Sequence, residues 1–290
     1  MKKVIILLVL IIGFSSCKDF KKGVEDGYND AKAEAEKTDI KVFALDGGSI
    51  LVNKLEVFSQ DTTYTGQTKQ LITPYYVISH PKGNLIWDAG LPEGLVLDEP
   101  FTEPSGVFTI QRPDSLANQL KSIGFKVEDF KYIALSHSHF DHTGHANYFK
   151  DATWLVQENE YNFVTNDSAQ VKDAGTYNSI KELTNVKKLN GDFDVFGDGT
   201  VVIKSMPGHT IGHQVLYLEL GLEKPVLLTG DLYHFEENRL NKGVPIFNSD
   251  VSQTLESMDK FEAFAKEKNA EVIIQHSTED FKKLKNLLKQ

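Results

Sequence analysis

The chain has 290 residues, of which 40% are hydrophobic and 25% charged, the composition of a globular protein rather than an intrinsically disordered one. Its 41 acidic residues outnumber its 31 basic residues, so we expect no nucleic acid as a partner. A single cysteine excludes both an intrachain disulfide and a cysteine-rich zinc module, so any metal must be held by histidine and carboxylate.

The N-terminus has the pattern of a secretory signal peptide. Two lysines precede an apolar run of about eleven residues, and small residues follow it. As a helix this run would be roughly 17 Å long, too short for the roughly 30 Å hydrocarbon core of a bilayer. Residues 14–17, Phe-Ser-Ser-Cys, resemble a bacterial lipobox, in which cleavage precedes the cysteine and its sulfur receives diacylglycerol. The alternative is a plain signal peptide with an incidental cysteine.

Three segments are therefore expected. Residues 1–16 are the signal peptide of a lipoprotein, with Cys17 as the lipidation site, and residues 17–39 are a polar tether with no apolar face to bury. Residues 40–290 form the globular domain. We expect an exported protein, anchored in the bacterial cell envelope through Cys17, at the outer membrane or the surface. Without lipidation it would be periplasmic or secreted.

From Ile40 onwards, short apolar runs alternate with turn residues, which is typical of strands. Strands are predicted at residues 50–52, 75–79, 84–87, 132–136, 154–156, 201–203, 215–218, 226–229 and 271–274. Helices are predicted from a cap at Asp114 to Gly124 and over residues 252–268, where apolar residues recur at helical spacing. The proline-flanked segment 91–112 is predicted to be a rim loop. This order of elements indicates a mixed α/β sandwich.

Four potential metal ligands follow the strand 132–136 within six residues: His137, His139, Asp141 and His142. Because alternate side chains of an extended chain point the same way, His137 and His139 can bind one metal ion. As the backbone turns toward a helix, Asp141 and His142 swing to an adjacent position and can serve a second ion. Neutral imidazole and carboxylate suit zinc when thiolates are absent.

Later strands end in further candidates. His209, Asp231 and His276 each follow a predicted strand directly, and α/β folds commonly gather their sites at the carboxyl ends of strands. The remaining histidines that we expect to be structural, or to support a ligand, are His80, His145 and His213.

Together these motifs resemble the metallo-β-lactamase superfamily, through His-x-His-x-Asp-His, the later histidine, the Gly-Asp pair and the last histidine. Residues 85–90, Leu-Ile-Trp-Asp-Ala-Gly, are similar to the strand ending in Asp-x-Gly of that family. The resemblance covers residues 40–285. It implies a single domain with the four-layer αββα sandwich and two metal ions at one edge.

The resemblance also implies a role for each candidate. Two Zn²⁺ ions are expected, although other divalent metals are possible. The first would be bound by His137, His139 and His209, the second by Asp141, His142 and His276, and Asp231 would bridge them. Asp88 is expected to orient a ligand histidine from outside the ligand set.

Within the family, the sequence resembles N-acyl-homoserine lactone lactonases, including secreted quorum-quenching enzymes. The similarity lies in residues 136–142 and 208–214, in the segment 120–130, and in the intervals of 22 residues from His209 to Asp231 and 45 residues from Asp231 to His276. It implies that a metal-bridging hydroxide attacks the lactone carbonyl and opens the ring, while Asp141 passes a proton to the leaving oxygen.

One position departs from the family pattern. These lactonases usually have a tyrosine three residues after the bridging aspartate, as a hydrogen-bond donor to the carbonyl oxygen. Here Tyr233 is two residues after Asp231 and His234 is three residues after it. Either residue is a candidate for the catalytic donor, so both remain open at this point.

Other functions stay in competition. Metal ligands alone do not separate a lactonase from a phosphotriesterase or a broad esterase, so the expected partner is a small-molecule lactone or ester. A β-lactamase and a non-catalytic binding lipoprotein are the less favoured alternatives. An acyl chain would need an apolar channel, for which the loop aromatics Phe101, Phe108, Phe140, Phe235 and Phe247 are candidates.

Overall fold

The computed structural model describes residues 39–96 and 99–289. The predicted signal peptide, Cys17 and nearly all of the predicted tether lie outside the described residues. No helix within the described ranges has both the length and the apolar character needed to cross a membrane.

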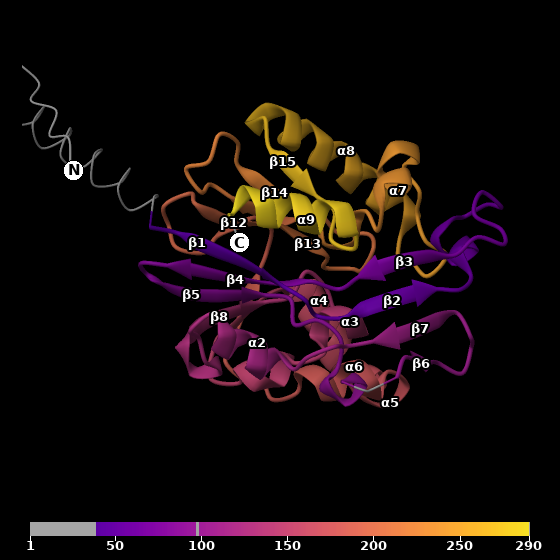
Figure 1. The fold of residues 1–290 in the computed structure, drawn as a ribbon, viewed down its shortest axis with the longest axis horizontal. Helices are drawn as coiled ribbons and strands as arrows, with labels where there is room; N and C mark the ends of the chain where they lie inside the picture. Colours follow the sequence, from indigo (N-terminus) through magenta and orange to yellow (C-terminus); the bar gives the residue numbers. More distant parts are fainter. Residues whose placement is uncertain (1–38, 97–98, 290) are drawn as a thin grey trace, which may run out of the picture.

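Two sheets stacked face to face form the centre of the domain (Figure 1). The first has six strands in the order β1 (Lys41–Leu45), β4 (Tyr75–His80), β5 (Gly83–Trp87), β8 (Phe130–Ala134), β9 (Thr153–Gln157) and β10 (Val186–Leu189). The second has five, in the order β11 (Phe193–Asp194), β12 (Val201–Ser205), β13 (Gln214–Leu218), β14 (Val226–Leu228) and β15 (Glu271–Ile273). From β5 to β10 the first sheet is parallel, and in the second only β14 and β15 pair in parallel.

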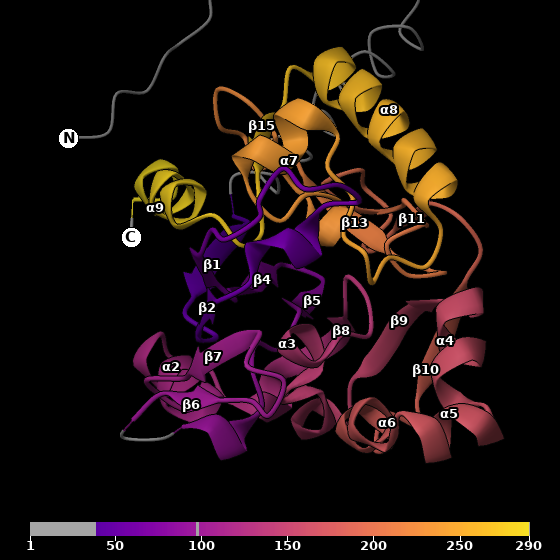
Figure 2. The ribbon, with the colours of Figure 1, turned by 90° about the vertical axis from the view of Figure 1, so that its right-hand side faces the viewer.

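Helices cover the outer faces of both sheets. Beside the first sheet lie α2 (Leu116–Ser122), α3 (Phe140–Thr143), α4 (Glu158–Thr165), α5 (Asp167–Lys172) and α6 (Ala174–Ile180), with η3 (Val127–Asp129) and η4 (Ala146–Phe149). Beside the second lie α7 (Glu236–Asn241) and α8 (Val251–Lys268). Figure 2 shows α9 (Thr278–Leu287) at one side of the sandwich, where it contacts β1 and β15.

Three apolar clusters explain this layering. Trp87 and Leu155 of the first sheet meet Leu216 and Leu228 of the second in a fully buried layer between the sheets. The opposite face of the first sheet packs on α2 and η4, and that of the second sheet packs on α8, through residues such as Phe261. Because strand side chains alternate between faces, both sheets are buried on both sides. The expected four-layer αββα sandwich is confirmed.

A smaller four-stranded sheet stands at one end of the sandwich, on the right of Figure 1. Its strands are β3 (Lys69–Ile72), β2 (Ser49–Val52), β7 (Phe108–Gln111) and β6 (Phe101–Thr102). Neighbouring 3₁₀ turns are η1 (Leu55–Phe58) and η2 (Glu93–Leu95). The prediction that residues 91–112 are only a rim loop is therefore wrong for its second half. Ile110 pairs with Ile50 across β2 and β7 and is buried, so a long-range partner turns this segment into a strand.

The predicted cap at Asp114 is also displaced by one residue. The Ser115 side chain accepts the hydrogen bond from the Asn118 backbone N–H, and α2 begins after it. Asp114 supports the turn instead, since its carboxylate accepts from the backbone N–H of Ser115. The sequence predicts no helix over the segments that form α4, α5, α6, α7 and α9.

Candidate metal centre

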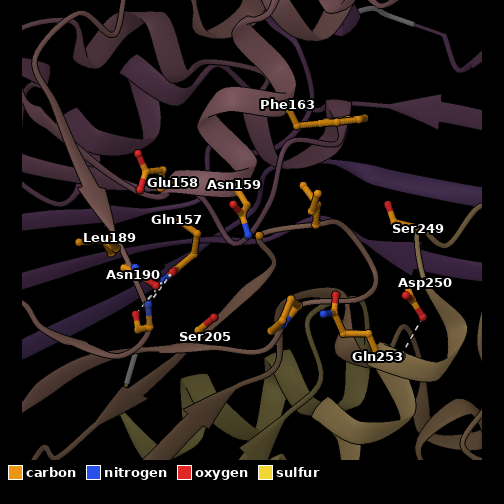
Figure 3. Close-up of a pocket in the computed structure, with 14 residues that line it drawn as sticks. Gln157, Glu158, Asn159, Phe163, Leu189, Asn190, Ser205, Ser249, Asp250 and Gln253 are labelled. Atoms are coloured by element: carbon orange, nitrogen blue, oxygen red, sulfur yellow. Dashed lines mark hydrogen bonds between the residues drawn. The ribbon is translucent and has the colours of Figure 1, made fainter.

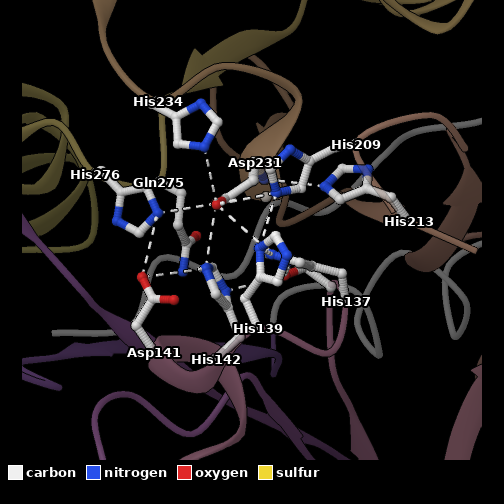
Figure 4. Close-up of polar contacts among 12 residues, drawn as sticks. His137, His139, Asp141, His142, His209, His213, Asp231, His234, Gln275 and His276 are labelled. Atoms are coloured by element: carbon white, nitrogen blue, oxygen red, sulfur yellow. Dashed lines mark hydrogen bonds and ion pairs between the residues drawn. The ribbon is translucent and has the colours of Figure 1, made fainter. Parts of the chain in front are cut away.

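The turn between β8 and α3 separates two pairs of potential ligands. His139 is still extended, with φ −69° and ψ 156°, and α3 begins at the next residue. His137 and His139 therefore precede the helix, whereas Asp141 and His142 lie in its first turn and point to a neighbouring position (Figure 4). The change from extended to helical backbone after His139 therefore divides the ligands of this short motif into two groups, as the sequence predicts.

The second sheet supplies the remaining ligands from the ends of its strands. His209 follows β12 in a turn at Gly208, whose φ of +133° and close contact with Thr254 leave no room for a Cβ. Asp231 lies in η5 (Gly230–Leu232) after β14, and His276 follows β15. Since β14 and β15 are parallel, their carboxyl ends bring these two side chains together.

Three histidines form the first group. Nδ1 of His139 is 2.8 Å from Nε2 of His137 and 3.1 Å from Nε2 of His209. Oδ2 of Asp231 is 3.6 Å from the Nε2 atoms of both His137 and His209. A tetrahedral zinc ion with bonds of about 2.1 Å holds its ligand atoms roughly 3.4 Å apart, so this spacing suits one ion.

The second group consists of Asp141, His142 and His276. Oδ1 of Asp231 is 3.2 Å from Nε2 of His142 and 2.9 Å from Nε2 of His276. Oδ2 of Asp141 is 3.6 Å and 3.7 Å from the same two nitrogens. The two oxygens of Asp231 thus face different histidine groups, which is the arrangement of a bridging carboxylate.

The protonation of the cluster follows from burial and charge. Burial and the neighbouring imidazoles hold the pKa values of His137 and His209 well below the usual histidine range, so both rings are neutral and can bind a cation. Burial also lowers the pKa of His142, but the carboxylates of Asp231 and Asp141 outweigh it and raise that pKa well above its usual range. Burial raises the pKa of Asp231, yet the facing histidines lower it well below the ordinary value.

These residues fit two divalent cations. Nε2 of His142 is buried and points into the cluster, where it makes no hydrogen bond and has a charge contact of 3.2 Å with Oδ1 of Asp231. A set of five imidazoles and two carboxylates offers the nitrogen and oxygen ligands that zinc accepts. A buried nitrogen that makes no hydrogen bond costs free energy, and a bound cation would remove that cost.

Buried partners hold the ligands from outside. Oδ2 of Asp88 is 3.0 Å from Nδ1 of His142, and its Oδ1 accepts the backbone N–H of Ser136 at 2.6 Å. The backbone of Asp88 has a φ of +60°, which is uncommon for a residue other than glycine. Holding the Asp88 carboxylate in this orientation therefore costs backbone strain. Gln275, which the sequence had not singled out, donates to the same carboxylate at 3.2 Å.

The three histidines expected to be structural divide into two kinds. His213 touches the cluster, because its Nε2 accepts the backbone N–H of Asp231. His80 stacks on Phe196 with a centroid separation of 3.9 Å, and His145 pairs with Glu93 at 2.7 Å, so neither reaches the ligand groups.

Of the two candidate donors, the structure brings only His234 to the cluster. Its Nε2 is 3.2 Å from Oδ2 of Asp231, and its ring stacks on that of His276. Tyr233 points away: its hydroxyl donates to Glu262 at 3.0 Å and its ring packs on Phe261. The backbone is extended at Tyr233, so consecutive side chains point to opposite sides, and the structure does not bring the candidate Tyr233 to the cluster.

An apolar hollow of about 310 Å³ opens directly onto the cluster. Its apolar lining residues are Ile50, Phe58, Leu71, Phe108, Phe140 and Phe247. It continues into a second hollow of about 430 Å³, since Phe108, Phe140 and Phe247 line both. Two of the expected channel aromatics lie elsewhere, because Phe235 is buried against Tyr64 and Phe101 lines neither hollow.

A larger hollow of about 550 Å³ is drawn in Figure 3, and Pro207, Ile211 and Gly212, which lie close to His209 in the sequence, are among its lining residues. Polar side chains dominate its lining, among them Gln157, Asn159 and Gln253. None of the candidate metal ligands lines it. The apolar hollow is therefore the one in contact with the candidate chemistry.

Comparison with known proteins agrees with this geometry. The family model of the metallo-β-lactamase superfamily matches residues 68–276. A Rhizobium radiobacter protein named N-acyl homoserine lactonase AttM is 30% identical over 261 residues, which cover 85% of this chain and 97% of that protein.

Two solved structures share the fold. An N-acyl homoserine lactone hydrolase with N-hexanoyl-L-homoserine bound at its catalytic metal centre has a TM-score of 0.69 at 27% identity, over 84% of this chain and 95% of that one. A mutant of B. thuringiensis AiiA with N-decanoyl-L-homoserine bound at the active site also has a TM-score of 0.69 at 27% identity, over 84% of this chain and 95% of that one. The family match, the αββα layers and the two ligand groups lead to one conclusion: the chain belongs to the metallo-β-lactamase superfamily.

Proposed function

We propose that this protein is a metal-dependent hydrolase that opens the lactone ring of N-acyl-homoserine lactones and so removes quorum-sensing signals. One observation carries the proposal: the carboxylate of Asp231 faces two histidine groups at the floor of an apolar hollow. A reacting carbonyl can thus meet a dinuclear centre while an acyl chain lies against apolar side chains. The names of the related lactonases support this reading.

The metal ions are proposed to be two Zn²⁺ per chain. His137, His139 and His209 would hold one, Asp141, His142 and His276 the other, and Asp231 would contact both. When bound, such a pair lowers the pKa of water and withdraws electron density from the carbonyl of the substrate.

The chain's own groups supply the remaining chemistry. Asp141 lines the hollow and is 7% exposed, so its carboxylate can accept the proton that the attacking water loses and pass it to the ring oxygen as the carbon–oxygen bond of the lactone breaks. His234 also lines the hollow, and its Nε2 makes no hydrogen bond, although Oδ2 of Asp231 lies 3.2 Å away. We assign to His234 the hydrogen bond to the carbonyl oxygen that a tyrosine makes in the lactonases.

The hollows themselves favour a neutral substrate with an apolar tail. The two connected hollows extend from the metal cluster past three phenylalanines to Val57, Val107 and Ile246. No Lys or Arg occurs among the described residues that line them, so a substrate carboxylate such as that of a β-lactam would have no cationic partner there. The same apolar walls would accept the substituents of a phosphotriester or an aryl ester, which are the competing substrates.

A substrate panel tests the proposal. Purified residues 18–290, loaded with Zn²⁺, should be assayed with N-hexanoyl and N-decanoyl homoserine lactone, a phosphotriester, an aryl ester and a β-lactam. We expect the highest kcat/KM for a lactone. A higher kcat/KM for the phosphotriester or the ester would replace the lactonase proposal with that activity. Metal analysis of the same sample should give about two ions per chain.

We further propose that the protein is exported and anchored by a lipid at Cys17. The support is the sequence pattern of residues 1–17 together with the absence of another cysteine. The variant Cys17→Ser should move the protein from the membrane fraction to the soluble envelope fraction. Unchanged fractionation would refute the lipid anchor and leave the hydrolase proposal untouched.

A further inference from the structure

A buried carboxylate outside the ligand groups connects the two loops that carry the first histidine group. Glu160 lies in α4 and is 2% exposed. Its Oε1 accepts the backbone N–H of Ser138 at 3.0 Å and the Ser138 hydroxyl at 2.6 Å. Its Oε2 accepts the backbone N–H of Gly212 at 2.8 Å. One side chain therefore binds both loops at once.

The positions of these two partners are specific. Ser138 stands between His137 and His139, and Gly212 stands three residues after His209. A Cβ on residue 212 would collide with the Cβ and the backbone nitrogen of Glu160, so only a glycine lets this loop come so close to α4. The first loop follows a strand of the first sheet and the second loop follows a strand of the second. Glu160 thus spans the junction between the two sheets.

Such a group is costly for the fold. Burial raises the pKa of the Glu160 carboxyl, and the hydrogen bonds from Ser138 and Gly212 only partly oppose that effect. No Lys or Arg in the described part of the chain forms an ion pair with Glu160, so only N–H and O–H donors compensate its charge. Buried carboxylates without a cationic partner are rare in structural cores, and they concentrate where function requires them.

We propose that Glu160 is a positioning residue that sets the spacing of His137, His139 and His209, and thereby the affinity of the first metal position. The inference rests on the metal positions of the proposed function. Among the described residues, no hydrogen bond or ion pair joins Glu160 to Asp141, His142 or His276, so we expect the second position to keep its affinity when Glu160 is changed. Groups that orient metal ligands from outside typically alter metal affinity by about 10- to 100-fold.

The variant Glu160→Gln tests this assignment. It keeps the size of the side chain, but its amide cannot accept hydrogen bonds from both loops. The matched control is Glu158→Gln, an exposed carboxylate on the same helix. The full mature chain is titrated with Co²⁺, and bound metal and the visible ligand-field spectrum are recorded. Reference spectra come from His209→Ala, which lacks a ligand of the first position, and from His276→Ala, which lacks one of the second.

We expect the wild type and Glu158→Gln to bind two Co²⁺ with similar affinity. Glu160→Gln should bind one ion as tightly as the wild type and the other about 10- to 100-fold more weakly, with a one-ion spectrum that matches that of His209→Ala. Wild-type affinity at both positions would overturn the inference. So would an equal weakening of both positions, because that result indicates a general packing role.

If Glu160→Gln does not fold, Ser138→Ala replaces it. That variant removes only the hydroxyl hydrogen bond, so a smaller weakening confined to the first position is expected, and no weakening refutes the inference. A wild-type chain that binds no metal would refute the proposed function as well. A wild type with two ions and an unaffected Glu160→Gln would refute this inference alone.

Discussion

The backbone N–H of Asp231 donates a hydrogen bond to Nε2 of His213 over 2.9 Å. The other ring nitrogen of His213, Nδ1, is 3.0 Å from the carbonyl oxygen of Met206, so Nδ1 carries the proton and Nε2 is free to accept. The imidazole is fully buried. A single tautomer therefore fixes the backbone of the residue whose carboxylate faces both histidine groups.

We expect His213→Ala to lower the free energy of unfolding by about 2–3 kcal/mol, because it leaves the N–H of Asp231 and the carbonyl of Met206 unpaired and creates a cavity. Urea unfolding of the chelator-treated chain measures this loss. Metal content should fall as well, since Asp231 is no longer held. The control is His80→Ala, another buried imidazole, which should lose stability but keep its metal content. Full metal content in His213→Ala would contradict the positioning of Asp231 by this ring.

The variant Asp231→Asn should affect both metal positions at once. It keeps the shape of the side chain but removes the charge that both histidine groups face. We expect fewer than one tightly bound ion per chain and an activity loss of at least about 100-fold. Metal analysis and lactone hydrolysis measure the two effects. The control is Asp198→Asn, which changes a half-buried carboxylate paired with Lys82 outside the ligand groups. Two tightly bound ions in Asp231→Asn would exclude the bridging role.

Two single variants separate the neighbouring residues Tyr233 and His234. His234→Ala should lower kcat by about 10²-fold, because the variant loses the hydrogen-bond donor to the carbonyl oxygen of the substrate. Tyr233→Phe should keep its kcat and lose about 1 kcal/mol of stability, because only the hydrogen bond to Glu262 disappears. Steady-state kinetics and urea unfolding test both statements. A larger kcat loss in Tyr233→Phe would reverse the assignment.

The apolar hollow predicts a dependence on acyl-chain length. The Phe247 ring lines both connected hollows and packs on Phe58 at 5.3 Å, so it can cover the distal part of a long chain. We expect Phe247→Ala to lower kcat/KM for N-decanoyl homoserine lactone by about 10-fold, which corresponds to the apolar contact of one or two methylene groups. The butanoyl lactone should change little. Phe101→Ala, which alters a half-exposed ring outside both hollows, is the control, and equal losses for both lactones would contradict this placement.

Stability should fall in mild acid because of His145. Burial lowers the pKa of His145 to about 4, helped by the charge of Arg112 and opposed by Glu93. In the unfolded chain its pKa is near 6.5, so the unfolded state binds the proton first and stability is lost as the pH falls from about 6.5 to 4. Between pH 7 and pH 5 the wild type should lose about 2 kcal/mol more than His145→Gln. Urea unfolding of both metal-free chains measures this difference, and parallel pH profiles would show that His145 contributes nothing.

The short-range features of this protein were determined by the sequence alone. The first four ligand candidates fall within six residues after one strand, so the two-residue repeat of a strand and the turn into a helix suffice to divide them into two groups. The same local logic placed His209, Asp231 and His276 at strand ends, and the αββα layers followed from the family resemblance. Asp88 was identified as the partner of a ligand histidine on the same basis.

Only the tertiary structure decided what depends on distant partners. The choice between Tyr233 and His234 depended on which of the two side chains faces the cluster. The two-residue repeat of an extended segment predicts that neighbouring side chains point to opposite sides, but it does not tell which of them faces the cluster. Ile50 and Leu71 reach the hollow because β2 pairs with β3 and β7, contacts between segments far apart in the sequence. Glu160 has no motif around it and acquires its role from the meeting of two loops. Local patterns encode which residues can bind a metal, whereas the packing of the two sheets selects the neighbours that hold and surround them.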